Sequence, residues 1–196
     1  MTDDRRFKLI PVEKLTTEQK VVYDAIRGGP RKSLGNSSAS SPGPIGGPFN
    51  VMLRSPGIGN IVQALGGEIR FKSSLPPKLN ELAIMVTARY WTSQYEWHAH
   101  CKLALAAGLD PAKAKDVAEN RRPENMDEDE AVIYDFSREL HETKRVSDAN
   151  FKRAVDRFGE RGAFDLIAVN GYYSLVSMCL NVDNTPLPDG VPLPLK

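Results

Sequence analysis

The stretch ELAIMVTARYWTSQYEWHAH, residues 81–100, constrains the fold more than any other part of the chain. It contains two of the three histidines, both tryptophans and two glutamates in otherwise mostly apolar surroundings. The apolar spacing predicts a helix over about 78–92, a short break, and a second helix that begins at Ser93 and is closed by Gly108. A helix that is apolar over much of its circumference has to be buried, so we expect the first helix to be enclosed on most sides.

Helical periodicity continues along most of the remaining chain. Apolar stripes and capping residues predict further helices over about 16–27, 58–71, 111–120, 127–144, 147–158 and 160–182. We expect inward-facing apolar stripes in three of them, formed by Ile61, Val62, Leu65 and Ile69, by Phe151, Ala154, Val155 and Phe158, and by Phe164, Ile167, Ala168, Gly171, Tyr172, Leu175, Met178, Cys179 and Val182. No run alternates as a strand would. The prediction is an all-α fold of roughly seven helices in a single domain over 1–196.

Two segments lack such periodicity. Residues 28–48 are rich in Gly, Pro and Ser, and such a composition buries too little apolar surface to offset the entropy of ordering. We interpret them as a flexible surface loop, with a functional loop ordered by a neighbouring subunit as the alternative. Residues 185–196 form a Pro-rich tail, which we expect to lie extended over a surface.

Composition excludes several classes of partner. A formal net charge of +1 gives no reason to expect nucleic acid or an anionic membrane. No run approaches the roughly 18 apolar residues of a membrane span, and no secretory signal is evident, so we expect a cytoplasmic protein. Cys101 and Cys179 form neither a Cys-x-x-Cys pair nor a zinc-type cluster. They are expected to be buried thiols, and neither a metal nor a cofactor is predicted.

Glu96 and His100 are candidates for acid/base chemistry. Residues four apart in a helix differ by about 40° in direction, so these two side chains share a face and can reach one another. His98 points about 200° away from Glu96 and is expected to lie outside their site. A carboxylate that orients an imidazole and raises its pKa is a standard general acid/base pair.

Structural interpretations remain open for each of these residues. Ser93 and Glu96 have the spacing of a capping box, in which Glu96 would only stabilise the start of its own helix. His100 could be a core histidine with a satisfied hydrogen bond. Glu81 could be a solvated glutamate in the first turn after Pro76-Pro77.

Tyr95 and Arg89 are weaker candidates for substrate contact. A tyrosine hydroxyl beside a base can relay protons, although packing is the simpler role for Tyr95. Arg89 could hold a substrate carboxylate through two hydrogen bonds, or pair with a neighbour on its helix. The residue pattern thus predicts a small-molecule substrate without identifying it.

Residues 81–89, 95–100 and 104–108 resemble the carboxymuconolactone decarboxylase family, which includes the AhpD-like alkylhydroperoxidases. The resemblance covers about residues 50–120 well and the helical remainder loosely. It implies an all-α fold that assembles into homo-oligomers, which could be dimers, trimers or hexamers. It also implies cofactor-free chemistry on a small carboxylated lactone from aromatic catabolism.

The peroxidase-type members carry a glutamate, a Cys-x-x-Cys pair and a histidine. Glu81 and His100 match the glutamate and the histidine, but Ser93 and Glu96 occupy the two cysteine positions. Without two thiols no disulfide can form, so the resemblance implies only a proton relay of Glu81, Glu96 and His100. We therefore expect a decarboxylase-like lyase. The alternatives are an antioxidant protein that uses Cys101 and a non-catalytic oligomeric protein with a degenerate site.

Overall fold

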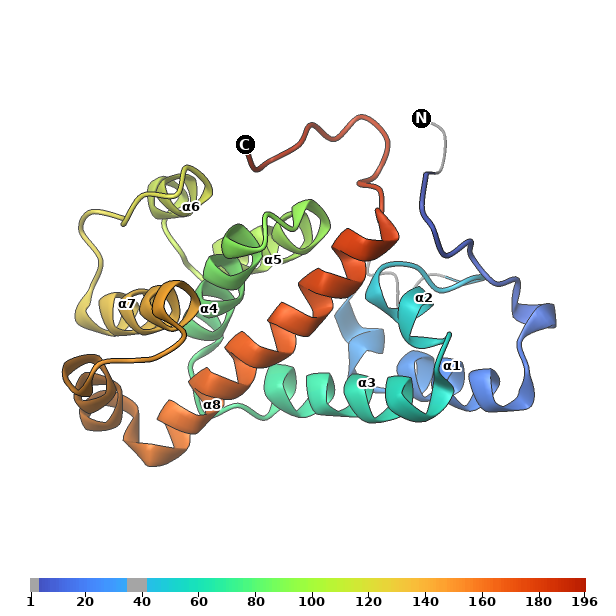
Figure 1. The fold of residues 1–196 in the computed structure, drawn as a ribbon, viewed down its shortest axis with the longest axis horizontal. Helices are drawn as coiled ribbons and strands as arrows, with labels where there is room; N and C mark the ends of the chain where they lie inside the picture. The colour runs from blue at the N-terminus through green and yellow to red at the C-terminus, as the bar shows by residue number, and fades with distance from the viewer. Residues whose placement is uncertain (1–3, 35–41) are drawn as a thin grey trace. The chain divides into compact units, whose positions relative to one another are not determined.

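The computed structural model describes residues 4–34 and 42–196, and the all-α prediction is confirmed (Figure 1). Within these residues the chain forms no strand and eight α-helices: α1 (Thr17–Gly28), α2 (Pro48–Met52), α3 (Pro56–Phe71), α4 (Pro77–Tyr90), α5 (Gln94–Ala106), α6 (Pro111–Ala118), α7 (Glu128–Thr143) and α8 (Asp148–Asp183). Short 3-10 helices add Val12–Lys14 and Pro30–Leu34. Proline at the first position of five helices explains several of the starts, because its missing N–H would lack a helical partner there anyway.

The chain divides into two compact units, where the sequence predicts one domain. The first unit comprises residues 1–72 and 179–186, and the second comprises 73–178 and 187–196. In the first unit, the predicted capping box of Thr16 and Gln19 starts α1. The apolar side of α1 then packs into a core with Ile45 and Leu53.

The described part of the predicted 28–48 loop is not all at the surface. Ile45 is buried in the core of the first unit, because an isolated apolar residue in a polar segment can still insert between helices. Arg31 is also buried, and its guanidinium donates to the Gln63 side chain and backbone. Residues 35–41 of this loop lie outside the described residues.

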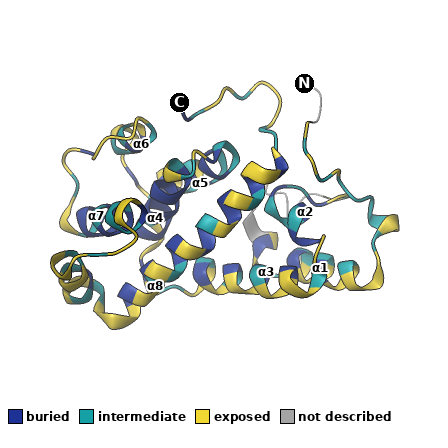
Figure 2. Ribbon diagram, viewed as in Figure 1, coloured by how far each residue is buried: buried dark blue, intermediate teal, exposed yellow. Residues whose placement is uncertain are grey.

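The centre of the second unit is α4. All ten residues from Leu79 to Ala88 are buried, as the continuous apolar pattern predicts, and α4 packs against both α5 and α7 (Figure 2). Around it, Asp110 caps α6, and a capping box of Asp127 and Glu130 starts α7. These caps satisfy backbone N–H groups that a helix leaves unpaired at its start.

The long helix α8 is two helices joined at Gly159. Its φ of 69° and ψ of 174° are non-helical and favour glycine, so the predicted break between 158 and 160 is confirmed. By length and composition α8 could also cross a membrane. This is weak evidence, because half of its most apolar window is buried inside the protein and core helices pass the same test.

The apolar stripe predicted to face inward on α8 faces mostly outward, so this prediction is wrong. Most of its large side chains are exposed, with Phe164 at 67% and Ile167 at 46% exposure, and only Tyr172 among the large ones is buried. The buried side is formed instead by Ala163, Leu166, Val169, Tyr173, Val176 and Leu180. Because α8 is apolar on two sides, helical period alone does not select the inner one. Phe151, on the segment before the break, is likewise exposed.

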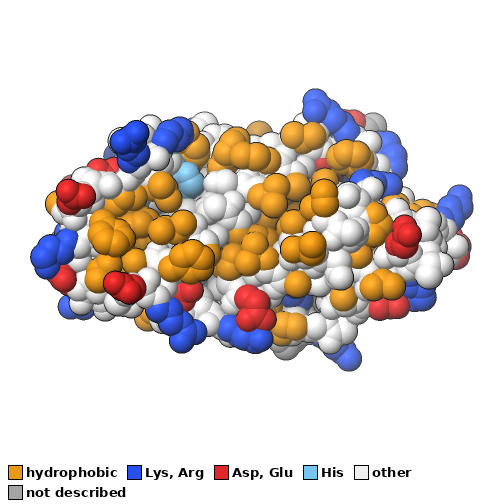
Figure 3. Space-filling view, turned by 60° about the horizontal axis from the view of Figure 1, so that its bottom comes forward, with side chains coloured by type: hydrophobic (Ala, Val, Ile, Leu, Met, Phe, Trp, Pro, Cys, Tyr) orange, Lys and Arg blue, Asp and Glu red, His pale blue; other side chains and the backbone are white. Residues whose placement is uncertain are grey.

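The same error occurs in α3. Ile61 and Leu65 are exposed, and of the predicted stripe only Ile69 is buried. Gly59, Gln63 and Gly66 form the rest of the buried side. Small residues face inward because α2 approaches closely: a Cβ on Gly59 would lie 2.2 Å from the Met52 carbonyl oxygen. Figure 3 shows how many hydrophobic side chains gather at the surface on one face of the protein.

Candidate active site

The candidate site lies on the α4–α5 hairpin of the second unit. Trp91 follows α4, Thr92 adopts a left-handed φ of 47°, and Ser93 occupies the N-cap position of α5. The chain thereby reverses within three residues. Glu81 on α4 is brought opposite His100 on α5, and Glu96 lies one turn before that histidine.

The three predicted relay residues are in direct contact. Glu81 Oε2 lies 2.6 Å from His100 Nδ1, and Glu96 Oε1 lies 3.0 Å from His100 Nε2. All three side chains are at least nine-tenths buried. The imidazole is therefore held through both nitrogens between two carboxylates, in a setting from which water is largely excluded.

The carboxylates determine the charge of His100. Burial alone would lower the pKa of His100, but the charges of Glu81 and Glu96 and their hydrogen bonds raise it to about 9. At neutral pH the ring is an imidazolium that donates from both nitrogens. His100 can thus give up a proton, while the three side chains together carry a net charge of −1.

The structural alternatives for the two glutamates are wrong. The Ser93 side chain makes no capping hydrogen bond, and the Glu96 carboxylate contacts His100 instead of its helix start. Glu81 is buried in the middle of α4 instead of being solvated in its first turn. The capping interpretation failed because a buried imidazolium attracts a carboxylate more strongly than a backbone N–H does.

The structure separates Arg89 from this chemistry. Its guanidinium donates to Thr92 Oγ1 at 3.1 Å and to the Lys196 carbonyl oxygen at 3.1 Å. Arg89 therefore binds the C-terminal tail, which lies across the end of α4. Tyr95 is half-buried in the first turn of α5, about 100° around the helix from Glu96.

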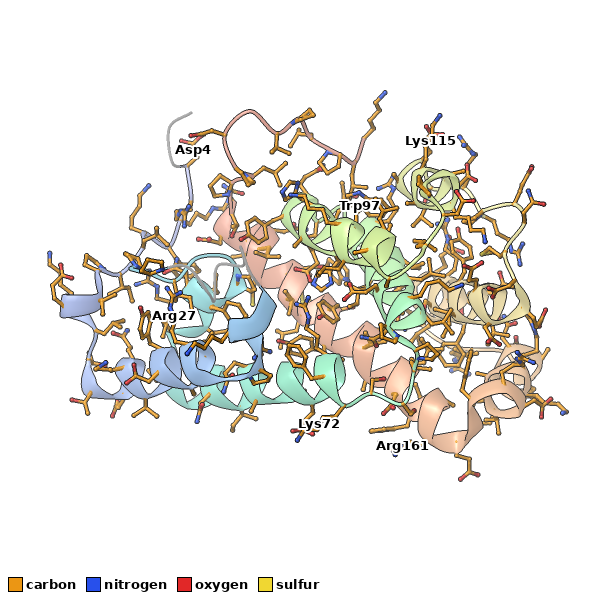
Figure 4. All side chains as sticks on the ribbon, turned by 180° about the vertical axis from the view of Figure 1, so that it is seen from behind. Asp4, Arg27, Lys72, Trp97, Lys115 and Arg161 are labelled. Carbon is orange, nitrogen blue, oxygen red and sulfur yellow. The ribbon has the colours of Figure 1, made fainter. Side chains whose placement is uncertain are left out.

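The tail is fastened at the same place. The Gln94 side-chain amide pairs with the Leu195 backbone through two hydrogen bonds, of 2.8 and 3.0 Å, and the Leu195 side chain is buried. Figure 4 shows the side chains around labelled Trp97, which is also buried, in the first half of α5. The predicted surface-lying tail therefore contacts the turn that carries Glu96.

His98 and Cys101 lie outside the relay. His98 Nε2 is 2.9 Å from Lys102 Nζ on a partly exposed side of α5, as the 200° argument predicts. Burial raises the pKa of the Cys101 thiol, so the reactive thiolate is disfavoured. Among the residues that the structure describes, no cluster of His, Cys, Asp and Glu is arranged to hold a metal ion.

Sequence reasoning missed Tyr173. Its ring on α8 meets the His100 ring edge to face, with centroids 4.9 Å apart, and covers one side of the imidazole. Tyr173 is 73 positions along the chain from His100, and no spacing rule connects the two helices. The only available signal was an apolar stripe, and the sequence assigned the wrong side of α8 to the core.

A separate surface pocket of about 360 Å³ lies along α7 and shares no residue with the relay. Its central carboxylate, Asp135, is already paired with Arg122 at 2.8 and 3.0 Å and with Arg153 at 3.1 Å. Because these ion pairs satisfy one another, the pocket is a weaker candidate for chemistry than the buried relay.

Comparison with known proteins supports the family resemblance. Residues 56–127 match the carboxymuconolactone decarboxylase family, and this range contains the whole α4–α5 hairpin. No curated protein matches the chain.

Proposed function

We propose a cofactor-independent enzyme in which His100 is the general acid, in a chain whose residues 56–127 match the carboxymuconolactone decarboxylase family. The observation that carries this proposal is the buried imidazole held between the carboxylates of Glu81 and Glu96, which raise its pKa to about 9. A histidine kept protonated above neutral pH is suited to donate a proton, and exclusion of water makes that transfer selective.

The substrate class that the resemblance implies is a small carboxylated lactone from aromatic catabolism. Loss of CO2 breaks a carbon–carbon bond and leaves its electron pair on the substrate as a carbanion or enolate. His100 donates its proton to that carbon, becomes neutral, and recovers a proton from solvent through Glu81 or Glu96. The net reaction consumes one proton and releases CO2, and it requires no oxidant or reductant.

Two other functions are less well supported. A peroxidase that relied on Cys101 would need a thiol of lowered pKa, whereas burial raises it. A non-catalytic protein with a degenerate site would have no reason to keep two buried carboxylates on one histidine. Such a cluster costs desolvation energy that apolar residues of similar size would avoid.

The test is CO2 release from carboxymuconolactone by the wild-type protein and by His100→Gln. We expect the variant to be slower by about 10²- to 10⁴-fold, the usual contribution of general acid catalysis. His98→Gln is the matched control, because it makes the same change two residues away on the partly exposed side of α5. Equal rates for His100→Gln and wild type would refute the assignment.

We also propose that the protein acts as a homo-oligomer. In the second unit, α8 exposes Phe164, Ile167, Leu175 and Met178 along one side. Apolar surface of this kind is rare on a soluble monomer and is typical of an interface. Sedimentation of Phe164→Glu should show a smaller assembly than wild type, whereas Lys152→Glu, which changes an exposed charged residue on α8, should not.

A further inference from the structure

The proposed reaction has an electrostatic requirement that the relay does not meet. A carboxylate substrate, or the enolate that it leaves, brings a negatively charged oxygen next to a cluster whose net charge is −1. Two like charges in a poorly solvated site repel strongly. Arg89, the cation predicted for this role, is held instead by Thr92 and the tail. Another donor group has to stabilise the anionic oxygen.

The first turn of α5 presents such donors. Ser93 is fully buried, and its Oγ has no hydrogen-bond partner. The backbone N–H of Glu96, which a serine at the N-cap position normally satisfies, also has no acceptor among the described residues. An O–H donor and an N–H donor therefore lie next to each other, three residues apart at a helix start, and neither is used.

Both donors lie beside the relay. Taking Ser93 as the reference direction, Glu96 and His100 lie within about 60° of it around the α5 axis, because three residues turn the helix by about 300° and seven by about 700°. Ser93, Glu96 and His100 thus share one face. An oxygen held by the Ser93 hydroxyl would be one to two turns from the proton of His100.

The helix adds a favourable charge. The N-terminus of a helix carries roughly half a positive charge, and its free N–H groups are a common binding site for anions. A buried hydroxyl without a partner ordinarily costs about 1–3 kcal/mol. A ligand oxygen that accepts from Ser93 and from the Glu96 N–H would remove that cost.

From these observations we propose that the first turn of α5 is the anion-binding part of the active site. The Ser93 hydroxyl and the Glu96 N–H would bind the carboxylate or enolate oxygen of a small substrate. This inference rests on the proposed function of the same site. It extends that function by assigning the substrate's negative charge to Ser93 and α5 instead of Arg89.

The test measures binding of acetate, a small carboxylate, to the full chain by the NMR shift of the Glu96 backbone amide. We expect a saturable shift, with acetamide, the neutral analogue, binding much more weakly. Ser93→Ala should weaken acetate binding by about 10- to 100-fold, the effect of removing one hydrogen bond to a charged group. Its unfolding midpoint should be no lower than that of wild type, because the deleted Oγ has no partner.

Ser137→Ala is the matched control, since Ser137 is equally buried but lies on α7 in another polar cluster. It should bind acetate like wild type. Unchanged binding by Ser93→Ala, equal weakening in both variants, or no response of the Glu96 amide to acetate would each overturn the proposal. If acetate binding requires Ser93 but carboxymuconolactone releases no CO2, the anion-binding site is supported and the proposed reaction is refuted.

Discussion

Two buried histidines of the second unit, His100 and His141, have opposite electrostatic surroundings. His100 lies between the carboxylates of Glu81 and Glu96, and its pKa is raised to about 9. His141 lies 3.0 Å from the neutral hydroxyl of Thr87. Burial lowers its pKa to about 4, with a further contribution from the charge of Lys144. Similar burial thus leaves one ring charged and the other neutral.

The contacts of His141 also define its tautomer. Thr87 Oγ1 lies 3.0 Å from the Ala83 carbonyl and 3.0 Å from Asn170 Oδ1, both of which only accept. The Asn170 amide orientation follows from its Nδ2, which donates to the Leu166 carbonyl. Thr87 has one proton, which one of those acceptors takes, so Nε2 of His141 has to carry a proton and donate to Thr87.

Burial alone therefore does not make a histidine functional. Both rings are enclosed, but only His100 stores a proton that it can donate near neutral pH. His141 joins α4, α7 and α8 through a network of neutral groups, which is the arrangement of a structural residue. The charge of the partner groups separates the two roles.

The largest expected effect comes from removing one carboxylate of the charged cluster. Glu81→Ala should lower the free energy of unfolding by about 3–5 kcal/mol, because it leaves a cavity in buried α4 and the Nδ1–H of a buried charged ring without its acceptor. Glu68→Ala, which removes an exposed glutamate paired with Lys72, should change it by less than about 1 kcal/mol. Urea unfolding measures both. Similar costs for the two variants would mean that the relay is not a buried charged cluster.

The two histidines should also limit stability at opposite ends of the pH range. The pKa of His100 is raised on folding, so its stabilisation is full below about pH 6.5 and is lost as pH rises through about 9. The pKa of His141 is lowered, so its stabilisation is full above about pH 6.5 and is lost as pH falls towards about 4.

Each contribution is of order 3 kcal/mol. The free energy of unfolding, measured across pH, should therefore fall less steeply at alkaline pH in His100→Gln than in wild type. In His141→Gln it should fall less steeply at acid pH. The opposite assignment, or a change on the same side of the pH profile in both variants, would contradict the difference between the two histidines.

A smaller loss is expected in the neutral network. Thr87→Val keeps the shape of the side chain but removes the hydroxyl that serves His141 and Asn170. It should cost about 1–3 kcal/mol, the usual price of a buried polar group left without its partner. Thermal unfolding gives the value. A cost as large as that of Glu81→Ala would show that charge does not distinguish the clusters.

The smallest effect should be the coupling between the clusters. Glu96→Gln removes one carboxylate beside His100 and should lower the pKa of that ring. The pKa of His141 should stay unchanged, because the deleted charge contacts the His100 ring, whereas His141 contacts Thr87. NMR titration of both rings in one sample tests this. A shift of the His141 pKa would contradict their independence.

The relay was predictable because its geometry is local. The i, i+4 spacing predicts that Glu96 and His100 meet, and the family resemblance adds Glu81 from the preceding helix. The capping role expected for Ser93 was wrong because that rule considers only the backbone. A charged ring elsewhere on the helix competes for Glu96, and this competition depends on burial.

The outward direction of α8 was not predictable in the same way. Phe164 and Ile167 are more apolar than the inward Ala163, so a periodicity argument favours them for the core. The choice between two apolar sides depends on which neighbouring helices are present and on their shape. The contact of Tyr173 with His100 follows from that choice and could not be derived without it.

Trp91 and Trp97 are the only tryptophans in the sequence, and both lie at the α4–α5 joint in the second unit. Tryptophan fluorescence therefore reports on that unit alone, whereas circular dichroism reports on the helices of both. An unfolding experiment that records both signals in one sample would show whether the two units melt as one cooperative body or in sequence. The hairpin that holds the site thus also supplies a built-in optical label for it.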